Sequence, residues 1–412
     1  MATTTASLPA GIPPTHPAVV ITAPRAPLSI LYRPTEAPGP GEALVHVEWT
    51  SSTPLDLHQA DGGLLIDPPH VGGSSFGGTV IALGPAPSDA SVAAAHNKLS
   101  VGDQVFGMAW QEPREHGFQT FITAPSYLMS KLPEGTRMQE AVTVSTNLVT
   151  VLHTLTKDLE LEMPRWLVDS PSSPDAKENT SKGNKEKDKK QWILVWGAAS
   201  SVGQYALQVL KSWGYQNVIA IASKRHHQEL LTLGAAVCFD YGQEDVTDLI
   251  RSHMATAAAS SSLSSNNNTT IPLVLNCIGS LKGSLRPLTR LAEKGTKVAV
   301  MLPVINKHAA DDEPPEYEMD ANKVLEGEWK EGVVLRGART YYYTHGVVKP
   351  NKQRIIEGAT LLKRATNALK ILRDRAQSGE KLVWRVDEKS AHELFPDLFV
   401  PKADPTKAET II

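Results

Sequence analysis

The pattern of apolar and polar residues changes along the chain and predicts two kinds of domain. From Pro17 to about residue 125, short apolar runs such as AVVITA, EALVHVEW and FQTFITAP are separated by clusters of Pro and Gly. This pattern is typical of β-strands joined by short turns. From Met138 to Leu159, apolar positions recur every three and four residues, which predicts one long helix. The first part of the chain is therefore expected to be a mostly β domain.

Strands and helices alternate in the second part. Trp192–Trp196 is a predicted strand and Gln204–Trp213 a predicted helix that Gly214 ends, and the further apolar runs are NVIAIA, AVCFDY, IPLVLNCIG and KVAVML. Apolar strands that alternate with helices are typical of a parallel sheet covered on both faces. The predicted fold class is therefore α/β, with a β domain followed by a doubly wound domain. After the doubly wound domain come a predicted helix, 358–380, and a predicted strand, 381–386, which form a short C-terminal return.

Polar, low-complexity stretches interrupt both parts. Residues 1–16 are predicted to be a flexible tail, and 169–190, where Lys alternates with Glu and Asp, a disordered insertion that buries too little apolar surface to fold. A functional basic tether is the alternative for 169–190. Residues 255–270 and 306–323 are predicted to be surface insertions.

Composition and charge restrict the class of partner. The 412 residues are 41% hydrophobic and 21% charged, with a net charge of −3. This balance argues against a nucleic acid or a membrane as an electrostatic partner. No run reaches about 18 apolar residues, and the first basic residue, Arg25, comes too late for a secretory or mitochondrial leader. A cytoplasmic location is expected.

Two cysteines, Cys238 and Cys277, lie in apolar strand-like runs. We expect buried, reduced thiols rather than a disulfide or metal ligands. A structural zinc site with four cysteines is impossible with this number.

The segment WILVWGAASSVG ends a strand in small residues, Gly197–Gly203. Unpaired N–H groups and the positive end of the helix dipole converge where a strand passes into a helix, and small side chains let a pyrophosphate approach them. The Ser200 and Ser201 hydroxyls add donors. The loop departs from G-x-G-x-x-G because serine replaces the middle glycine, and an ordinary tight turn is the alternative.

The second strand of this part ends in SKRHH, residues 223–227, without a carboxylate. NAD sites use an acidic residue here for the ribose hydroxyls, whereas the 2′-phosphate of NADP needs positive charge. Lys224 and Arg225 supply such charge, so NADPH is predicted over NADH. An exposed basic helix start is the alternative. Tyr241, after the third strand, is a candidate neighbour of the adenine, or an ordinary core or surface tyrosine.

Several stretches together resemble a known family. TPLDLHQADGG, FGGTVIALG, VGDQVFG, GAASSVGQYALQVLKSWGY, LNCIG and SGEKLVWRV occur in the order typical of the medium-chain dehydrogenase/reductase superfamily. Over about residues 17–387 the chain resembles its zinc-independent fungal group, which contains trans-acting enoyl reductases and is similar to quinone oxidoreductases. The resemblance implies a GroES-like catalytic domain, 17–155 completed by 345–412, a Rossmann NADP-binding domain, 156–344, and an active site in the cleft.

The resemblance also implies roles for individual residues. The expected cofactor contacts are Ser200, Ser201, Val202 and Gly203 at the pyrophosphate, Ser223, Lys224 and Arg225 with His226 at the 2′-phosphate, Thr53, Pro54, Leu55 and Asp56 at the nicotinamide, and Leu302, Lys381 and Leu382. Asn147 and Thr150 resemble substrate-side positions, with helix packing or capping as the alternative.

No catalytic zinc is expected. Zinc-dependent relatives need a cysteine, a histidine–acid pair and a later cysteine or acid, whereas Pro54, Ser74 and Ser75 occupy the corresponding neighbourhoods here. His58 and His70 have no cysteine or second close ligand nearby in the sequence. Both are therefore predicted to be surface residues rather than zinc ligands. The relatives often carry a lysine where His58 stands. His58 or solvent is therefore the candidate proton donor, and Asp56 is expected to orient the loop or the nicotinamide ribose.

These observations give one working hypothesis and two alternatives. The hypothesis is a zinc-independent NADPH-dependent reductase that transfers hydride to an activated C=C bond of an α,β-unsaturated thioester or ketone, because neutral hydrogen-bond donors suffice more readily there than at an isolated carbonyl. The alternatives are a quinone or aldehyde reductase on the same fold and an NADPH-binding interaction or sensor protein without catalysis. The expected partner is a small-molecule substrate, free or as a carrier-bound thioester, and both a monomer and a homodimer stay open.

Overall fold

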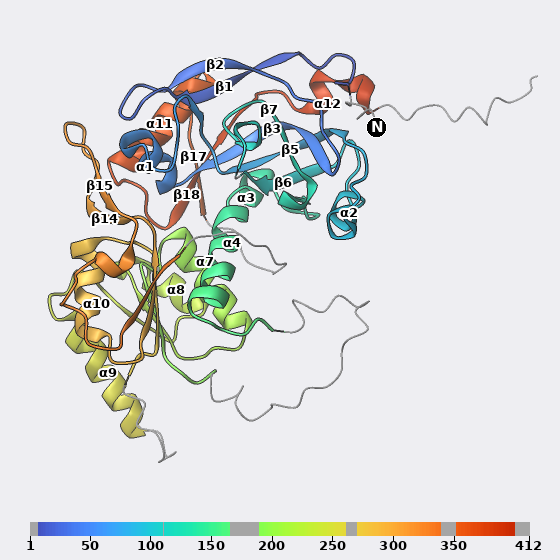
Figure 1. Ribbon diagram of the computed structural model, residues 1–412. Helices are drawn as coiled ribbons and strands as arrows, with labels where there is room; N and C mark the ends of the chain where they lie inside the picture. The colour runs from blue at the N-terminus through green and yellow to red at the C-terminus, as the bar shows by residue number, and fades with distance from the viewer. Residues whose placement is uncertain (1–6, 110, 165–188, 261–269, 339–351, 400–412) are drawn as a thin grey trace, which may run out of the picture. The chain divides into compact units, whose positions relative to one another are not determined.

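The computed structural model describes residues 7–109, 111–164, 189–260, 270–338 and 352–399. Contacts within the chain divide it into two compact units (Figure 1). The β unit comprises Met1–Ser145, Gln353–Leu372 and Leu382–Ile412, and the α/β unit comprises Thr146–Lys352 and Arg373–Lys381.

The β unit is built around one long strand, β3 (Glu42–Ser52), whose last ten residues are buried. It pairs in antiparallel fashion with β5, β7 and β18 and so anchors a seven-stranded sheet. Six of the strands follow the order β17-β18-β3-β5-β6-β8, and β7 pairs with β3 off this path, while a second sheet has the order β2-β1-β4. The other strands are β1 (Thr15–Ile21), β2 (Ser29–Pro34), β4 (His70–Val71), β5 (Ser75–Leu83), β6 (Gln104–Met108), β7 (Phe121–Pro125), β8 (Met129–Lys131), β17 (Lys352–Ile355) and β18 (Glu380–Arg385). The helices are α1 (Pro54–Gly62), α2 (Ala90–His96), α3 (Met138–Ala141), α11 (Leu361–Arg373) and α12 (Ala391–Leu394).

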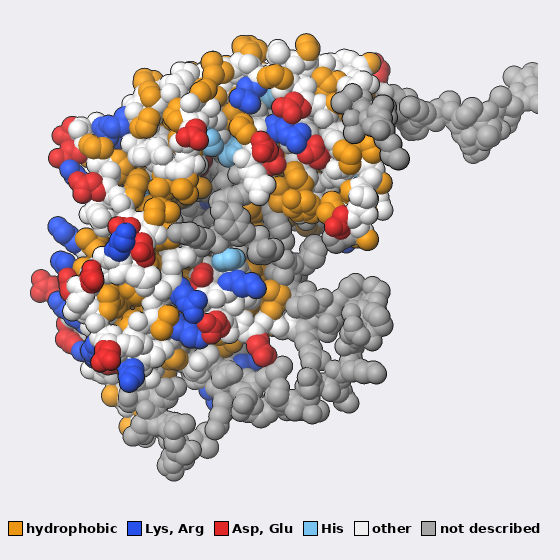
Figure 2. Space-filling view, in the orientation of Figure 1, with side chains coloured by type: hydrophobic (Ala, Val, Ile, Leu, Met, Phe, Trp, Pro, Cys, Tyr) orange, Lys and Arg blue, Asp and Glu red, His pale blue; other side chains and the backbone are white. Residues whose placement is uncertain are grey.

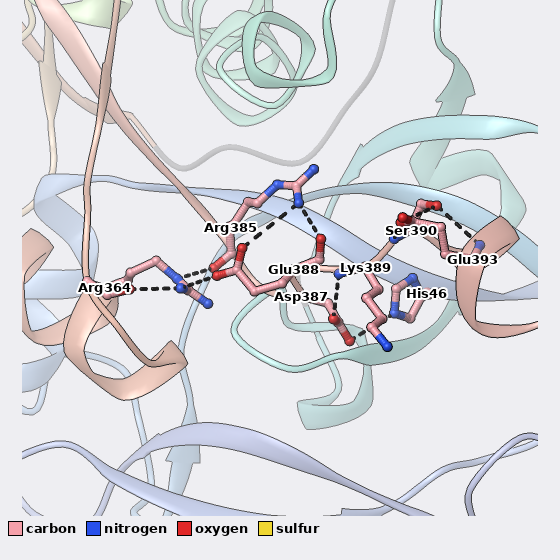
Figure 3. Close-up of polar contacts among 9 residues, drawn as sticks. His46, Arg364, Arg385, Asp387, Glu388, Lys389, Ser390 and Glu393 are labelled. Carbon is pink, nitrogen blue, oxygen red and sulfur yellow. Dashed lines mark hydrogen bonds and ion pairs between the residues drawn. The ribbon is translucent and has the colours of Figure 1, made fainter.

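Polar contacts hold the C-terminal return together, and one of them joins it to β3 (Figure 3). Arg364 of α11 is 6% exposed, and its guanidinium donates to the carbonyls of Arg385 at 2.7 Å and Gly358 at 2.9 Å and to the Glu388 carboxylate at 2.5 Å. The fully buried His46 ring of β3 lies 3.2 Å from Asp387. These bonds satisfy groups that would be costly to bury alone.

The α/β unit contains a six-stranded sheet of order β11-β10-β9-β12-β13-β16, in which every pair is parallel. In chain order this is 3-2-1-4-5-6, the arrangement of a dinucleotide-binding doubly wound sheet. Figure 1 shows α9 and α10 on one face of the sheet and α7 and α8 on the other. The strands are β9 (Ile193–Trp196), β10 (Val218–Ile221), β11 (Val237–Phe239), β12 (Leu273–Asn276), β13 (Lys297–Met301) and β16 (Val334–Ala338), with a hairpin of β14 (Val304–Lys307) and β15 (Glu316–Glu318). The helices are α4 (Ser145–His153), α7 (Ser201–Ser212), α8 (His227–Leu233), α9 (Val246–Ser260) and α10 (Arg286–Leu291).

The predicted fold class is thus confirmed, but the prediction of a single helix from Met138 to Leu159 is wrong. Helix α3 ends at Ala141, α4 starts at Ser145, and Thr154–Asp158 forms a π turn. Between α3 and α4 lie three consecutive β-branched residues, Val142 to Val144, which lose side-chain freedom in a helix. The Thr143 hydroxyl also donates to the Glu140 carbonyl at 2.7 Å and so competes with the helical bonding pattern.

The prediction of a flexible tail over residues 1–16 also needs correction. The tail is shorter than 16 residues, because Ile12 is buried, β1 begins at Thr15, and the buried His16 ring hydrogen-bonds Thr35 at 2.9 Å. Segment 306–323, predicted to be a surface insertion, is mostly exposed or half-buried, and it contains strand β15 and the buried Ala321. The predicted insertion 169–190 lies outside the described residues except for its last two. Within the described ranges, no helix is long and apolar enough to cross a bilayer.

Candidate functional site: the nucleotide loop and its surroundings

The small-residue loop connects β9 to α7 in the α/β unit. Ser200 is the N-cap of α7, and its hydroxyl accepts the Gly203 N–H at 3.1 Å. The first-turn N–H groups of a helix have no intrahelical acceptor and favour an anion. The Asn147 amide donates to the Ser201 hydroxyl, so helix α4 also supports the loop. The loop therefore has the form that a pyrophosphate needs.

Two glycines set the shape of this loop. Gly197 has a φ of +81°, and a Cβ there would lie 2.4 Å from Cγ1 of Ile278. A Cβ at Gly203 would lie 2.6 Å from both the Ala198 Cα and the Gly197 carbonyl oxygen, which are backbone atoms that cannot move aside. Gly203 is thus required by close approach of main chain to main chain, and Gly197 by its positive φ and by the Ile278 side chain.

The basic turn follows β10 as a short 3₁₀ turn, Lys224–His226. Lys224 and Arg225 are exposed, and the Ser223 hydroxyl lies 2.7 Å from the Tyr241 hydroxyl. Tyr241 is 52% exposed, so it is not a core residue, and its place beside the adenine stays a prediction. The structure brings together Ser223, Lys224, Arg225 and Tyr241 as the sequence predicts, at the carboxyl ends of two neighbouring strands, β10 and β11.

An acidic residue missed by the sequence analysis lies at this turn. Asp240, directly after β11, accepts the Lys224 N–H at 3.3 Å and the Gly242 N–H at 2.9 Å. Its backbone bonds indicate that it shapes the turn. Its position at the end of the third strand was the available signal, because the carboxyl ends of parallel strands share one edge. On the face seen in Figure 2, side chains of both signs are interspersed.

The predicted nicotinamide segment, Thr53–Asp56, forms the start of helix α1 in the β unit. Thr53 is the N-cap, and the Asp56 carboxylate accepts the Thr53 N–H at 2.6 Å and the Gly73 N–H at 3.3 Å. Asp56 is only 3% exposed, so its carboxylate is held by backbone donors. This geometry supports an orienting role for Asp56. Pro54 is exposed, whereas Leu55 and His58 are half-buried.

His70 does not lie on the surface as predicted. It is half-buried and packs edge-on against His116, with ring centroids 4.9 Å apart. Burial lowers the pKa of His70, and burial together with the neighbouring His70 lowers the pKa of His116 to about 3. The two rings are therefore neutral at physiological pH. Within the described parts of the chain, no three His, Cys, Asp or Glu residues cluster as metal ligands would.

The remaining predicted site residues differ in how deeply they are buried. Leu302 is half-buried beside Gly337, and Lys381 is 2% exposed. The Leu382 side chain is fully buried in the core of the β unit, so any ligand contact would come from its backbone. The Thr150 hydroxyl donates to the Thr146 carbonyl at 2.9 Å, which is a helix-internal bond. The substrate-side roles of Asn147 and Thr150 stay predictions.

The loop after β12 was also missed as a neighbour of the nucleotide loop. The buried Asn276 amide oxygen accepts the N–H groups of Ile278 at 3.0 Å and Gly279 at 2.9 Å. This fixes Ile278, which is 39% exposed, against Gly197. Cys277 and Cys238 are free thiols, and burial raises their pKa values to about 12 and about 11.

Comparison with known proteins agrees with this architecture. Residues 39–153 match the alcohol dehydrogenase GroES-like domain family. A GroES-like domain and a Rossmann unit in one chain define a medium-chain dehydrogenase/reductase. Trans-enoyl reductase tazE of Aspergillus terreus (strain NIH 2624 / FGSC A1156) is 30% identical over 245 residues, 57% of this chain and 71% of that protein. The chain therefore belongs to the medium-chain dehydrogenase/reductase superfamily, in the group of the trans-enoyl reductases.

Other relatives and folds extend the comparison. Trans-enoyl reductase tndF of Aspergillus flavipes is 31% identical over 246 residues, 58% of this chain, and the chain spans only 63% of that relative's length. The quinone oxidoreductase of Coxiella burnetii has a TM-score of 0.60 at 19% identity, covering 90% of this chain and 100% of that one. Mycobacterial Rv1454c, solved in complex with NADPH, has a TM-score of 0.57 at 20% identity, covering 90% and 99%. At such identities the structures show a shared fold.

Proposed function

We propose that this protein is a zinc-independent, NADPH-dependent reductase of an activated C=C bond. The observation that carries the proposal is the turn after β10, where Lys224 and Arg225 are exposed beside Ser223 and Tyr241. A 2′-phosphate needs such charge-assisted donors, whereas the carboxylate that follows β11, Asp240, accepts two backbone N–H groups. NADPH would supply the hydride when bound.

The protein's own residues would bind the cofactor and orient its nicotinamide. In the α/β unit, Ser200, Ser201, Val202 and Gly203 are proposed to hold the pyrophosphate, with the Ser200 cap keeping the start of α7 in place. In the β unit, residues Thr53–Asp56 are proposed to border the nicotinamide, since the Asp56 carboxylate rigidifies that helix start. A fixed loop holds its geometry without reorganisation, which favours productive alignment.

An activated C=C bond is a suitable substrate for a site whose hydrogen-bond donors are neutral. The neighbourhoods that hold metal ligands in zinc-dependent relatives contain Pro54, Ser74 and Ser75, and a prolyl ring and hydroxyls are poor zinc ligands. Reduction of a conjugated bond collects charge on a carbonyl oxygen, which neutral donors can stabilise. His58, half-buried on α1, or solvent would then supply the proton at the α carbon.

The first test is binding. NADPH and NADH are titrated against the full chain, its Lys224→Ala/Arg225→Ala variant and a control, Lys323→Ala, which removes an exposed cation elsewhere on the α/β unit. We expect NADPH to bind more tightly, and the double variant to weaken NADPH by about 10- to 100-fold per lost contact with little change for NADH. Equal binding of both cofactors, unaffected by the double variant, would refute the NADPH assignment.

The second test is the reaction. Nicotinamide oxidation is followed with an enoyl thioester, a quinone and an aldehyde, before and after treatment with a chelator. We expect the enoyl thioester to be reduced fastest, with activity unaffected by the chelator and no stoichiometric zinc in the purified protein. Preference for the quinone or aldehyde, or loss of activity on chelation, would contradict the proposal. Tight NADPH binding without turnover of any acceptor would favour the non-catalytic alternative.

A further inference from the structure

A short segment of the chain touches both phosphate subsites of the α/β unit. This return segment, residues 376–381, comes back to the α/β unit about 150 residues after the basic turn. The Gln204 amide, on α7, donates both to the Ala199 carbonyl of the nucleotide loop at 3.0 Å and to the Gly379 carbonyl of the return segment at 3.2 Å. One side chain thus links the return segment to the pyrophosphate loop.

The same segment also contacts the basic turn. The Ser378 hydroxyl lies 2.9 Å from Nε2 of His226. The next residue, Gly379, has a φ of +70°, and a Cβ there would lie 2.7 Å from Cε1 of His226 and 3.0 Å from its Nδ1. The segment therefore packs closely against the imidazole, and both the positive φ and this contact favour glycine at 379.

His226 in turn holds Arg225. The Arg225 Nε–H donates to His226 Nε2 at 3.1 Å. A guanidinium only donates, so Nε2 must be an acceptor and the imidazole must be neutral, and the Ser378 hydroxyl, which lies against the same Nε2, must donate to it as well. Burial, with the Arg225 charge second, lowers the pKa of His226, which keeps the ring in that state. Because Nε is engaged, the two terminal nitrogens of Arg225 stay available in a fixed plane.

We propose that the return segment, through Ser378 and His226, orients the Arg225 guanidinium and so determines the preference for a 2′-phosphate. Ser378 and His226 are positioning residues in this scheme, since Arg225 is the group that would meet the ligand. The inference rests on the proposed function, because it assumes that Arg225 binds the 2′-phosphate.

Variants of the full chain test the proposal. Dissociation constants are measured for NADPH, NADH and 2′,5′-ADP with Ser378→Ala, His226→Leu, Arg225→Ala and a control, Ser252→Ala, which removes an exposed hydroxyl on α9. We expect Ser378→Ala to weaken NADPH and 2′,5′-ADP by about fivefold and His226→Leu by at least as much, with NADH unchanged. Ser378→Thr, which keeps the hydroxyl, should restore the NADPH affinity.

The outcomes separate this proposal from the proposed function. If Ser378→Ala leaves NADPH binding unchanged, or weakens NADPH and NADH equally, the return segment does not set selectivity and the inference is wrong, while a large effect of Arg225→Ala would leave the cofactor assignment standing. If the wild-type chain has no preference for NADPH, or Arg225→Ala does not affect 2′,5′-ADP, the cofactor assignment itself fails and the inference fails with it.

Discussion

Replacing Asp158 with asparagine should stabilise the protein at neutral and alkaline pH. Asp158 ends the π turn that follows α4, and its Oδ2 atom is buried without a hydrogen-bond partner among the described residues. Burial raises its pKa from 3.8 to about 6, against the opposing charge of Arg336. The folded state therefore binds this proton more tightly than the unfolded state does.

The gain in stability can be calculated from the difference between the folded-state and unfolded-state pKa of Asp158. Where a folded-state pKa is raised, stability falls as pH rises from about 4 to about 6, and the loss is complete above that range. One pKa unit corresponds to about 1.4 kcal/mol, so a shift of about 2 units sets an upper limit of roughly 3 kcal/mol. Because Asp158 is half-exposed, solvent screening reduces this to about 1 kcal/mol. Asparagine is neutral at every pH and avoids the loss.

Thermal unfolding between pH 4 and pH 8 measures the prediction. For a cooperative unit of roughly 200 residues, about 1 kcal/mol raises the melting temperature by about 2–4 °C. Asp158→Asn should therefore melt higher than wild type at pH 8, and the difference should shrink toward zero at pH 4. Asp312→Asn, which neutralises an exposed carboxylate of the same unit, is the matched control and should show no such gain. A gain of equal size at all pH values, or none at pH 8, would refute the titration argument.

Three further substitutions test the nucleotide loop, the C-terminal return and the start of α1. Gly203→Ala places a Cβ 2.6 Å from the Ala198 Cα, so NADPH affinity in a fluorescence titration should fall on the order of tenfold, and unchanged affinity would contradict the close-approach argument. Arg364→Lys keeps a charge but not the planar fork that reaches three acceptors, so urea unfolding should show a loss of about 2–3 kcal/mol. Asp56→Ala removes the acceptor for the Thr53 N–H and should lower the free energy of unfolding by about 1 kcal/mol, whereas no loss would show that the cap contributes little.

The fold could be predicted because its strongest signals are local. Strands β9 and β10 are continuous apolar runs whose residues are all buried, and the small residues after β9 reflect a requirement of the main chain at one turn. The break after Ala141 in the helix predicted from Met138 was less visible in the sequence. Val142 and Val144 continue the apolar period, while their branched side chains disfavour a helix.

The partners of the site residues could not be predicted in the same way. Ser378 lies 152 residues from His226, and Asp240 lies 16 residues from Lys224 across a helix. Periodicity reports which face of an element is buried, and it carries no information on which distant residue meets that face. His70 shows the same limit, since its burial depends on His116 in another segment.

The pairing of β18 with β3 joins Leu382 to Ser52, which lie 330 positions apart (382 − 52). During translation at about 5–20 residues per second, roughly 15–65 s separate the synthesis of these two partners. Strand β7 covers Glu42–His46 of this edge of β3, so the part from Trp49 to Ser52 waits with its hydrogen-bonding groups open while the whole α/β unit is made. Nascent chains of this protein should depend on chaperones until that part of the edge closes.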